Sequence, residues 1–138
     1  MKEEDLQIQV ADYLRFRYPG AIFHSDFGSG VRLTMGQAIK QKRQNGGRRA
    51  WPDLQIAEPV PRCVDGSWNH EYNGLFIELK REGTRLKKKN GEWASSHIAE
   101  QAEILQKLTD RGYKAVFAVG FDEAKEIIDN YLRLMEEG

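Results

Sequence analysis

Two short apolar segments of this chain carry charged residues at positions where a buried strand normally has none. The first is Trp51–Ile56, with the sequence WPDLQI, and the second is Leu75–Lys80, with the sequence LFIELK. Both are predicted to be strands. Pro52 cannot donate to a sheet ladder, so Asp53 is expected at the start of the first strand. Core strands that keep charged residues point to a functional site.

The second strand is expected to place Glu78 and Lys80 on one face, because side chains alternate along a strand. The opposite face would then enter the core with Leu75, Ile77 and Leu79.

Asp53, Glu78 and Lys80 would meet at the ends of two adjacent strands. Hard cations such as Mg²⁺ bind one or two carboxylates together with substrate phosphate. A nearby lysine can orient or deprotonate water, or neutralise phosphate charge. Taken singly, Pro-Asp is commonly a turn and Glu-x-Lys a solvated pair. Taken together, the pattern favours a metal site that cleaves phosphodiesters.

The composition is that of one globular domain spanning residues 1–138, with 40% apolar and 30% charged residues. No apolar run approaches the roughly 20 residues that a membrane helix needs. The N-terminus lacks an apolar signal core, so we expect a cytoplasmic protein without a membrane partner. A single cysteine, Cys63, permits neither an internal disulfide nor a thiolate zinc cluster.

The net charge is zero, but basic residues gather in two windows around the two strands. A charge run is usually a solvated face, yet two windows that bracket such a site favour a surface for the phosphate backbone. The window before Asp53 has no acid and contains Arg32, Lys40, Lys42, Arg43, Arg48 and Arg49. The window after Glu78 has one acid, Glu82, and contains Lys80, Arg81, Arg85, Lys87, Lys88 and Lys89.

Apolar periodicity and turn residues predict a mixed central sheet flanked by helices, an α/β fold. Residues 58–73 are expected to form a long connection or a partly paired hairpin, and residues 86–93 a hairpin about Asn90-Gly91. Helices are predicted over 3–18, 34–44, 97–111 and from 122 onward, and strands over 21–24, 53–57, 75–80 and 113–119.

The order Pro52-Asp53 and then Glu78-Leu79-Lys80 resembles the PD-(D/E)XK nuclease superfamily, and more narrowly its VRR-NUC branch, the virus-type replication-repair nucleases. The family places a glutamate on its opening helix, where this chain has Glu3-Glu4-Asp5, and a glutamine after the catalytic lysine, where it has Gln101. The resemblance covers nearly the whole chain except residues 58–73, and it implies a restriction-endonuclease-like fold.

The resemblance also implies a site that binds Mg²⁺, or Mn²⁺, through Asp53, Glu78 and the backbone carbonyl of Leu79. Lys80 would act in the chemical step. The remaining catalytic candidates are Gln101, which would position water or a substrate oxygen, and Glu4, which would support a second ion or the hydration of the first.

The expected substrate is DNA, and the analogy extends to branched forms such as four-way junctions and to a homodimer. Two alternatives stay open: a non-catalytic DNA-binding module, and an RNA-directed metal nuclease, because phosphate contacts do not separate DNA from RNA. The residues expected to contact phosphates are Arg48, Arg49, Arg81, Arg85, Lys87, Lys88 and Lys89.

Overall fold

A computed structural model describes residues 1–26, 34–46 and 50–137 of the chain. Each helix and strand predicted from the sequence is present, with ends that differ by at most two residues. In chain order the elements are α1 (Glu3–Arg17), β1 (Phe23–Ser25), α2 (Met35–Gln44), β2 (Leu54–Ile56), β3 (Val60–Val64), β4 (Ser67–Tyr72), β5 (Leu75–Lys80), α3 (Ser96–Asp110), β6 (Lys114–Val119) and α4 (Phe121–Glu137).

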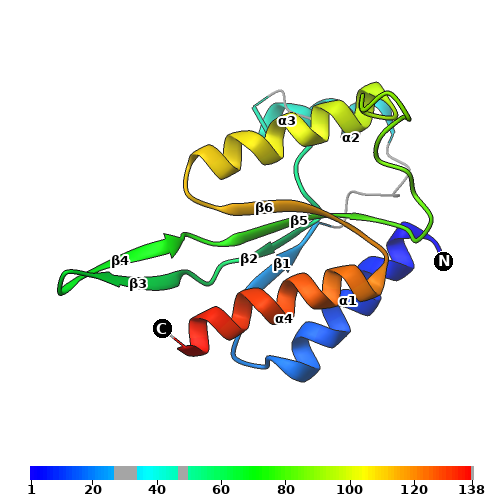
Figure 1. The fold of residues 1–138 in the computed structure, drawn as a ribbon. Helices are drawn as coiled ribbons and strands as arrows, with labels where there is room; N and C mark the ends of the chain where they lie inside the picture. The colour runs from blue at the N-terminus through cyan, green and yellow to red at the C-terminus, as the bar shows by residue number, and fades with distance from the viewer. Residues whose placement is uncertain (27–33, 47–49, 138) are drawn as a thin grey trace.

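The main sheet has the strand order β1-β2-β5-β6. Strand β2 is antiparallel to both β1 and β5, whereas β5 and β6 are parallel and are joined by α3 as a crossover. Helices α1 and α4 cover one face of the sheet, and α2 and α3 lie on the other side (Figure 1). The expected mixed sheet flanked by helices is therefore confirmed.

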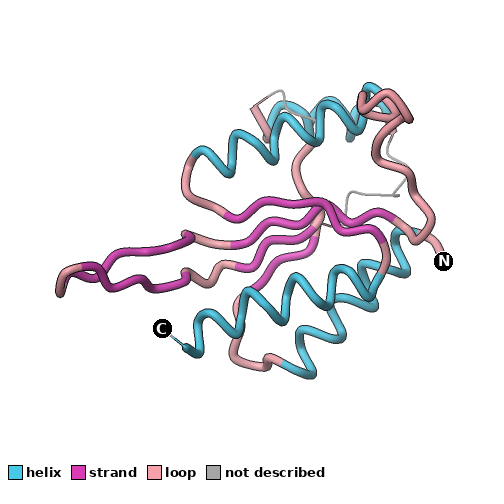
Figure 2. The backbone as a smooth tube through the Cα atoms, in the orientation of Figure 1, coloured by secondary structure: helices cyan, strands magenta, loops and turns pink. Residues whose placement is uncertain are grey.

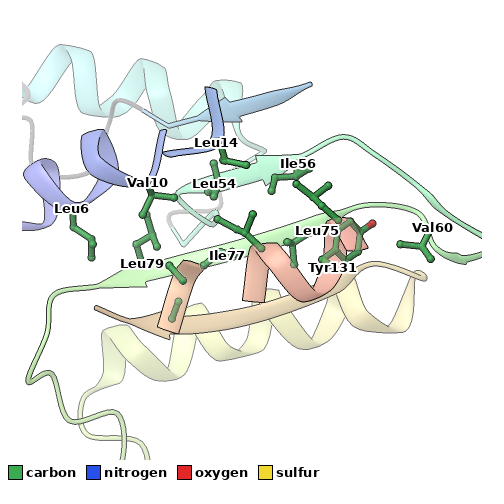
Figure 3. Close-up of a cluster of buried hydrophobic side chains, with 14 residues drawn as sticks. Leu6, Val10, Leu14, Leu54, Ile56, Val60, Leu75, Ile77, Leu79 and Tyr131 are labelled. Atoms are coloured by element: carbon green, nitrogen blue, oxygen red, sulfur yellow. The ribbon is translucent and has the colours of Figure 1, made fainter. Parts of the chain in front are cut away.

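The face of the sheet under α1 and α4 forms the hydrophobic core. Leu75, Ile77 and Leu79 of β5 point into it and are at most 1% exposed, as strand alternation predicted. They lie among side chains from α1 and Tyr131 from α4 (Figure 3). Burying each such side chain contributes about 1.5–3 kcal/mol, so the position of β5 is strongly fixed.

The opposite face of β5 is also buried. Phe76 points toward the α3 side and is packed edge-on between Trp51 and Tyr113, with ring centroids 5.4 and 5.1 Å away. All six residues of β5 are buried, including the charged ones. A charged side chain on this strand is thus held inside the protein.

Helix α1 is attached to α4 through Asp129. Its Oδ1 accepts hydrogen bonds from the hydroxyls of Tyr13 and Tyr18, at 2.5 and 2.7 Å, and its Oδ2 accepts one from Lys125 at 2.9 Å. These bonds fix the orientation of α1, and with it the position of the acidic residues at its N-terminal end.

The segment 58–73 forms a complete antiparallel ribbon, β3–β4, which extends away from the helices (Figure 2). The pair Val64 and Ser67 is closed by Asp65 and Gly66, which have φ angles of 51° and 79°. Two central residues with positive φ are the mark of a type I′ turn, for which Asp-Gly is a favoured sequence. In the described part of the chain, no helix is long and apolar enough to cross a membrane.

Candidate active site between the central strands and helix α3

Strand β5 carries Glu78 and Lys80 beneath α3, on the face opposite the core. Glu78 is 3% exposed and Lys80 is 6% exposed. The Nζ atom of Lys80 lies 3.9 Å from Oε1 of Glu78, so the two form a buried ion pair. The sequence prediction that both point to one face is confirmed by this contact.

Asp53 precedes β2 and lies beside Glu78, because the next residue, Leu54, pairs with Ile77 of β5. Its Oδ2 accepts a hydrogen bond from the backbone N–H of Leu79 at 2.9 Å. Asp53 is 4% exposed. The carboxylate is therefore hydrogen-bonded directly to the strand that carries Glu78, and the two acids lie close together as expected, although Asp53 is one residue before β2 rather than on it.

Gln101 reaches the same site from α3. Ser95 caps this helix by accepting a hydrogen bond from the N–H of Ile98, which is buried along with Leu105 on the face toward the sheet. Gln101 lies on that face, and its Nε2 donates to Oε1 of Glu78 at 2.7 Å. The structure thus brings Asp53, Glu78, Lys80 and Gln101 together.

Two acceptor oxygens at this site have no hydrogen-bond partner within the described residues. They are Oε2 of Glu78 and Oε1 of Gln101, both fully shielded from solvent. A buried acceptor without a partner costs about 1–3 kcal/mol. The site therefore has the donor atoms that a cation and its coordinated water would use.

The two carboxylates also have perturbed acidities. Burial raises the pKa of Asp53, although contacts with Glu78 and the N–H of Leu79 oppose the rise. Burial and then the nearby Asp53 carboxylate raise the pKa of Glu78, and Lys80 offsets only part of this. Two negative charges side by side in a low-dielectric site are unfavourable unless a cation is near. This is the electrostatic setting that a divalent cation would relieve.

The donor set fits Mg²⁺ or Mn²⁺ only if it is completed by other oxygen atoms. Among the described residues, no three His, Cys, Asp or Glu side chains converge in a way that could hold a metal ion. Leu79 can add only backbone atoms, because its side chain is in the core. Mg²⁺ usually keeps several waters and takes one or two carboxylates plus phosphate oxygens, which matches the Asp53–Glu78 pair.

Helix α1 contributes a third acid near the pair, and it is Glu3. Its negative charge raises the pKa of both Asp53 and Glu78. Glu3 is half-buried, whereas its neighbour Glu4 is exposed. Helical spacing distinguishes Glu3 from Glu4 in the sequence, since Glu3 is on the same side of the helix as the buried residues Leu6 and Val10.

The basic segment after β5 is an ordered hairpin. Lys87 pairs with Trp93, and the Trp93 ring packs on Phe117 of β6 with centroids 5.7 Å apart. The N–H of Lys88 donates to the carbonyl of Glu92, which closes the turn around Asn90-Gly91 as predicted. The exposed cations on this hairpin are Arg85, Lys87, Lys88 and Lys89, and none forms an ion pair within residues 1–26, 34–46 and 50–137.

Arg81 lies apart from this hairpin. It lines a cavity of about 250 Å³ with Met1 and Gln9 of the N-terminal region and Asp122 of α4. Arg48 and Arg49 lie outside the described residues.

Comparison with known proteins gives a match in structure. No protein-family model matches the sequence, and no curated protein matches it. A solved structure described as a "VRR_NUC domain protein" superposes with a TM-score of 0.64, covering 97% of this chain and 90% of that chain at 26% sequence identity. The superposition therefore includes nearly all of this chain.

The buried carboxylate pair makes a prediction about stability in the absence of metal. In a chelating buffer, Asp53→Asn should raise the free energy of unfolding by roughly 1–3 kcal/mol, because an amide removes one negative charge and can donate to Oε2 of Glu78. Urea unfolding measures the change. Glu100→Gln, on the exposed side of α3, is the control and should stay within about 0.5 kcal/mol. A clear loss of stability in Asp53→Asn would contradict the description of the pair.

Proposed function

We propose that this chain, which has a VRR-NUC fold, is a Mg²⁺- or Mn²⁺-dependent endonuclease that hydrolyses phosphodiester bonds in DNA. The observation that carries the proposal is the buried Asp53–Glu78 pair, with Lys80 and Gln101 against it. A module that only bound DNA would gain nothing from two buried carboxylates, because they repel phosphate. Their cost is understandable if they bind a cation that acts on the phosphate.

Asp53 and Glu78 would hold the cation, with the carbonyl of Leu79 as a further ligand. When bound, a divalent cation acidifies water and offsets charge on the scissile phosphate. Lys80 lies beside Glu78, where its ammonium group can donate to a phosphate oxygen or orient the attacking water. Gln101 has its Nε2 committed to Glu78, which leaves Oε1 able to accept a hydrogen bond from that water.

Glu3 is better placed than Glu4 to serve as the acid from the first helix. The charge of Glu3 acts on both carboxylates, so it would support the bound cation through its hydration or hold a second one. Groups that act on a metal through its ligands or waters commonly change affinity or activity by about 10–100-fold.

The hairpin 86–94 would contact the phosphate backbone. Its first lysine, Lys87, is seven residues after Lys80 of β5, and the Trp93–Phe117 contact holds the hairpin in place. An ordered basic loop loses less conformational entropy on binding than a flexible one.

Branched DNA and a homodimer are the finer parts of the proposal. Paired cuts across a four-way junction require two sites in fixed orientation, which a twofold dimer supplies. The ribbon β3–β4 exposes Trp68 and Val64, at 69% and 46%, as apolar surface for a second copy. Light scattering that gives the monomer mass of 15.9 kDa at micromolar concentration, together with paired junction cleavage, would refute the dimer.

Metal binding and chemistry can be separated by substitution. Saturating Mn²⁺ should stabilise the wild type by about 2.7 kcal/mol at a hundredfold excess over the Kd, measured by thermal unfolding. Glu78→Gln should lose both this stabilisation and cleavage of linear, flapped and four-way-junction DNA. Lys80→Ala should keep the stabilisation while cleavage falls by roughly 10²–10⁴-fold.

Glu92→Gln, in the basic hairpin, is the matched control and should behave as the wild type. If Glu78→Gln cuts at the wild-type rate, the site is wrong. If the protein cuts only RNA of the same shapes, the proposed metal site is supported and the assignment of DNA as the substrate is wrong.

The first helix offers a matched pair of neighbouring acids. Glu3→Gln should lower Mn²⁺ affinity and cleavage by about tenfold or more, because its charge acts on the carboxylate pair. Glu4→Gln should change neither, since Glu4 is exposed. Titration of Mn²⁺ followed by unfolding and cleavage assays measures both. A larger loss of Mn²⁺ affinity and cleavage in Glu4→Gln than in Glu3→Gln would assign the metal-supporting role to Glu4 instead.

A further inference from the structure

Helix α2 contributes no buried residue to the protein. Nine of its ten residues are exposed, and only Gln41 is partly covered. A helix of this length is marginal in water unless an amphipathic face packs against something. Thr34 and Gln37 form a capping box that stabilises its first turn, but this supplies no tertiary contact.

The apolar side of α2 faces the opposite way from that of a helix that packs on a core. Met35 and Ile39 lie one turn apart and are 81% and 54% exposed. Arg43 continues this row by another turn. Gln41 lies on roughly the opposite side, where the helix is least exposed. The apolar row therefore faces outward, away from the rest of the chain.

All the formal charges of α2 are positive. Lys40 and Lys42 flank the row of Met35, Ile39 and Arg43 on either side by helical geometry. Lys40 and Arg43 also line an open hollow with Gln44. Within the described residues, none of the three cations forms an ion pair. The outward face is thus an apolar row bordered by unneutralised cations.

The position of α2 relates it to the active site. It lies on the same side of the sheet as α3 (Figure 1). Glu78 and Lys80 point to that side, since Gln101 of α3 contacts Glu78. A polyanion that approaches the carboxylate pair from this side would therefore lie on the same side of the sheet as α2.

We propose that α2 is a docking helix for the nucleic acid, and this rests on the proposed nuclease function. Lys40, Lys42 and Arg43 contact phosphates, while Met35 and Ile39 pack against sugars and base edges between them. Charge selects this occupant: a polyanion complements the three cations, whereas the α2 helices of two copies would repel each other. Bound DNA would then pack against the apolar row of α2, which no other part of the described chain covers.

The test measures DNA binding by the full chain in a chelating buffer, so that no strand is cut. Lys40→Ala/Arg43→Ala should weaken binding of a duplex and of a four-way junction on the order of tenfold, and lower the slope of log K against log salt by about two. Met35→Gln/Ile39→Gln should weaken binding without changing that slope. Arg15→Ala/Arg133→Ala, on α1 and α4, is the charge-matched control and should match the wild type. All variants should keep the wild-type melting temperature, because none removes a core contact.

If Lys40→Ala/Arg43→Ala binds DNA with the affinity and salt slope of the control while the wild type cleaves normally, the role of α2 is wrong. The proposed nuclease function would be unaffected by that result. Absence of both binding and cleavage in the wild type would overturn the nuclease function as well. If the α2 variants instead change the mass in light scattering while binding DNA normally, α2 is an interface between copies and the proposal is wrong.

Discussion

Asp53, one residue before β2, and Glu78 of the neighbouring β5 have almost no access to water, and the rest of the site follows from that placement. Each carboxylate alone could be kept ionised by its own partners: Asp53 by the N–H of Leu79, and Glu78 by Lys80 and Gln101. Burial and then the neighbouring Asp53 carboxylate raise the pKa of Glu78, and Lys80 offsets only part of the rise. Retaining both acids in the interior is costly, and a divalent cation is the simplest agent that offsets the cost.

The fold fixes this pair by building both faces of β5 into the interior. Leu75, Ile77 and Leu79 fix the strand from below, and Phe76 fixes it from above. The site residues therefore sit on a rigid element, as precise chemistry requires. The basic hairpin and α2 differ, because both are at the surface and their cations form no ion pair among the described residues. A rigid carboxylate site next to basic surfaces is the arrangement that the proposed cleavage of a polyanion requires.

Much of this could be predicted from the sequence, for physical reasons that apply to particular residues. Strand alternation placed Glu78 and Lys80 together, and an apolar strand after Pro52 placed Asp53 beside them. The choice between Glu3 and Glu4 could not be made from composition, because adjacent acids are equally favourable in a first helical turn; only the helical stripe separates them. The ribbon β3–β4 was foreseen only in part, although Asp65-Gly66 carries the turn signal. The outward apolar row of α2 could not be predicted, since the pattern of Met35 and Ile39 normally indicates a buried face.

We infer that the Asp53–Glu78 pair binds a divalent metal ion, and the proposed function depends on this binding. The most direct measurement is anomalous diffraction from crystals of the wild-type protein grown with Mn²⁺. We expect an anomalous peak between the two carboxylates at roughly 2.0–2.2 Å from an oxygen of each, with the carbonyl of Leu79 and waters completing the ligands. A map without a peak there at saturating Mn²⁺, with the carboxylates paired to each other through a proton instead, would contradict it.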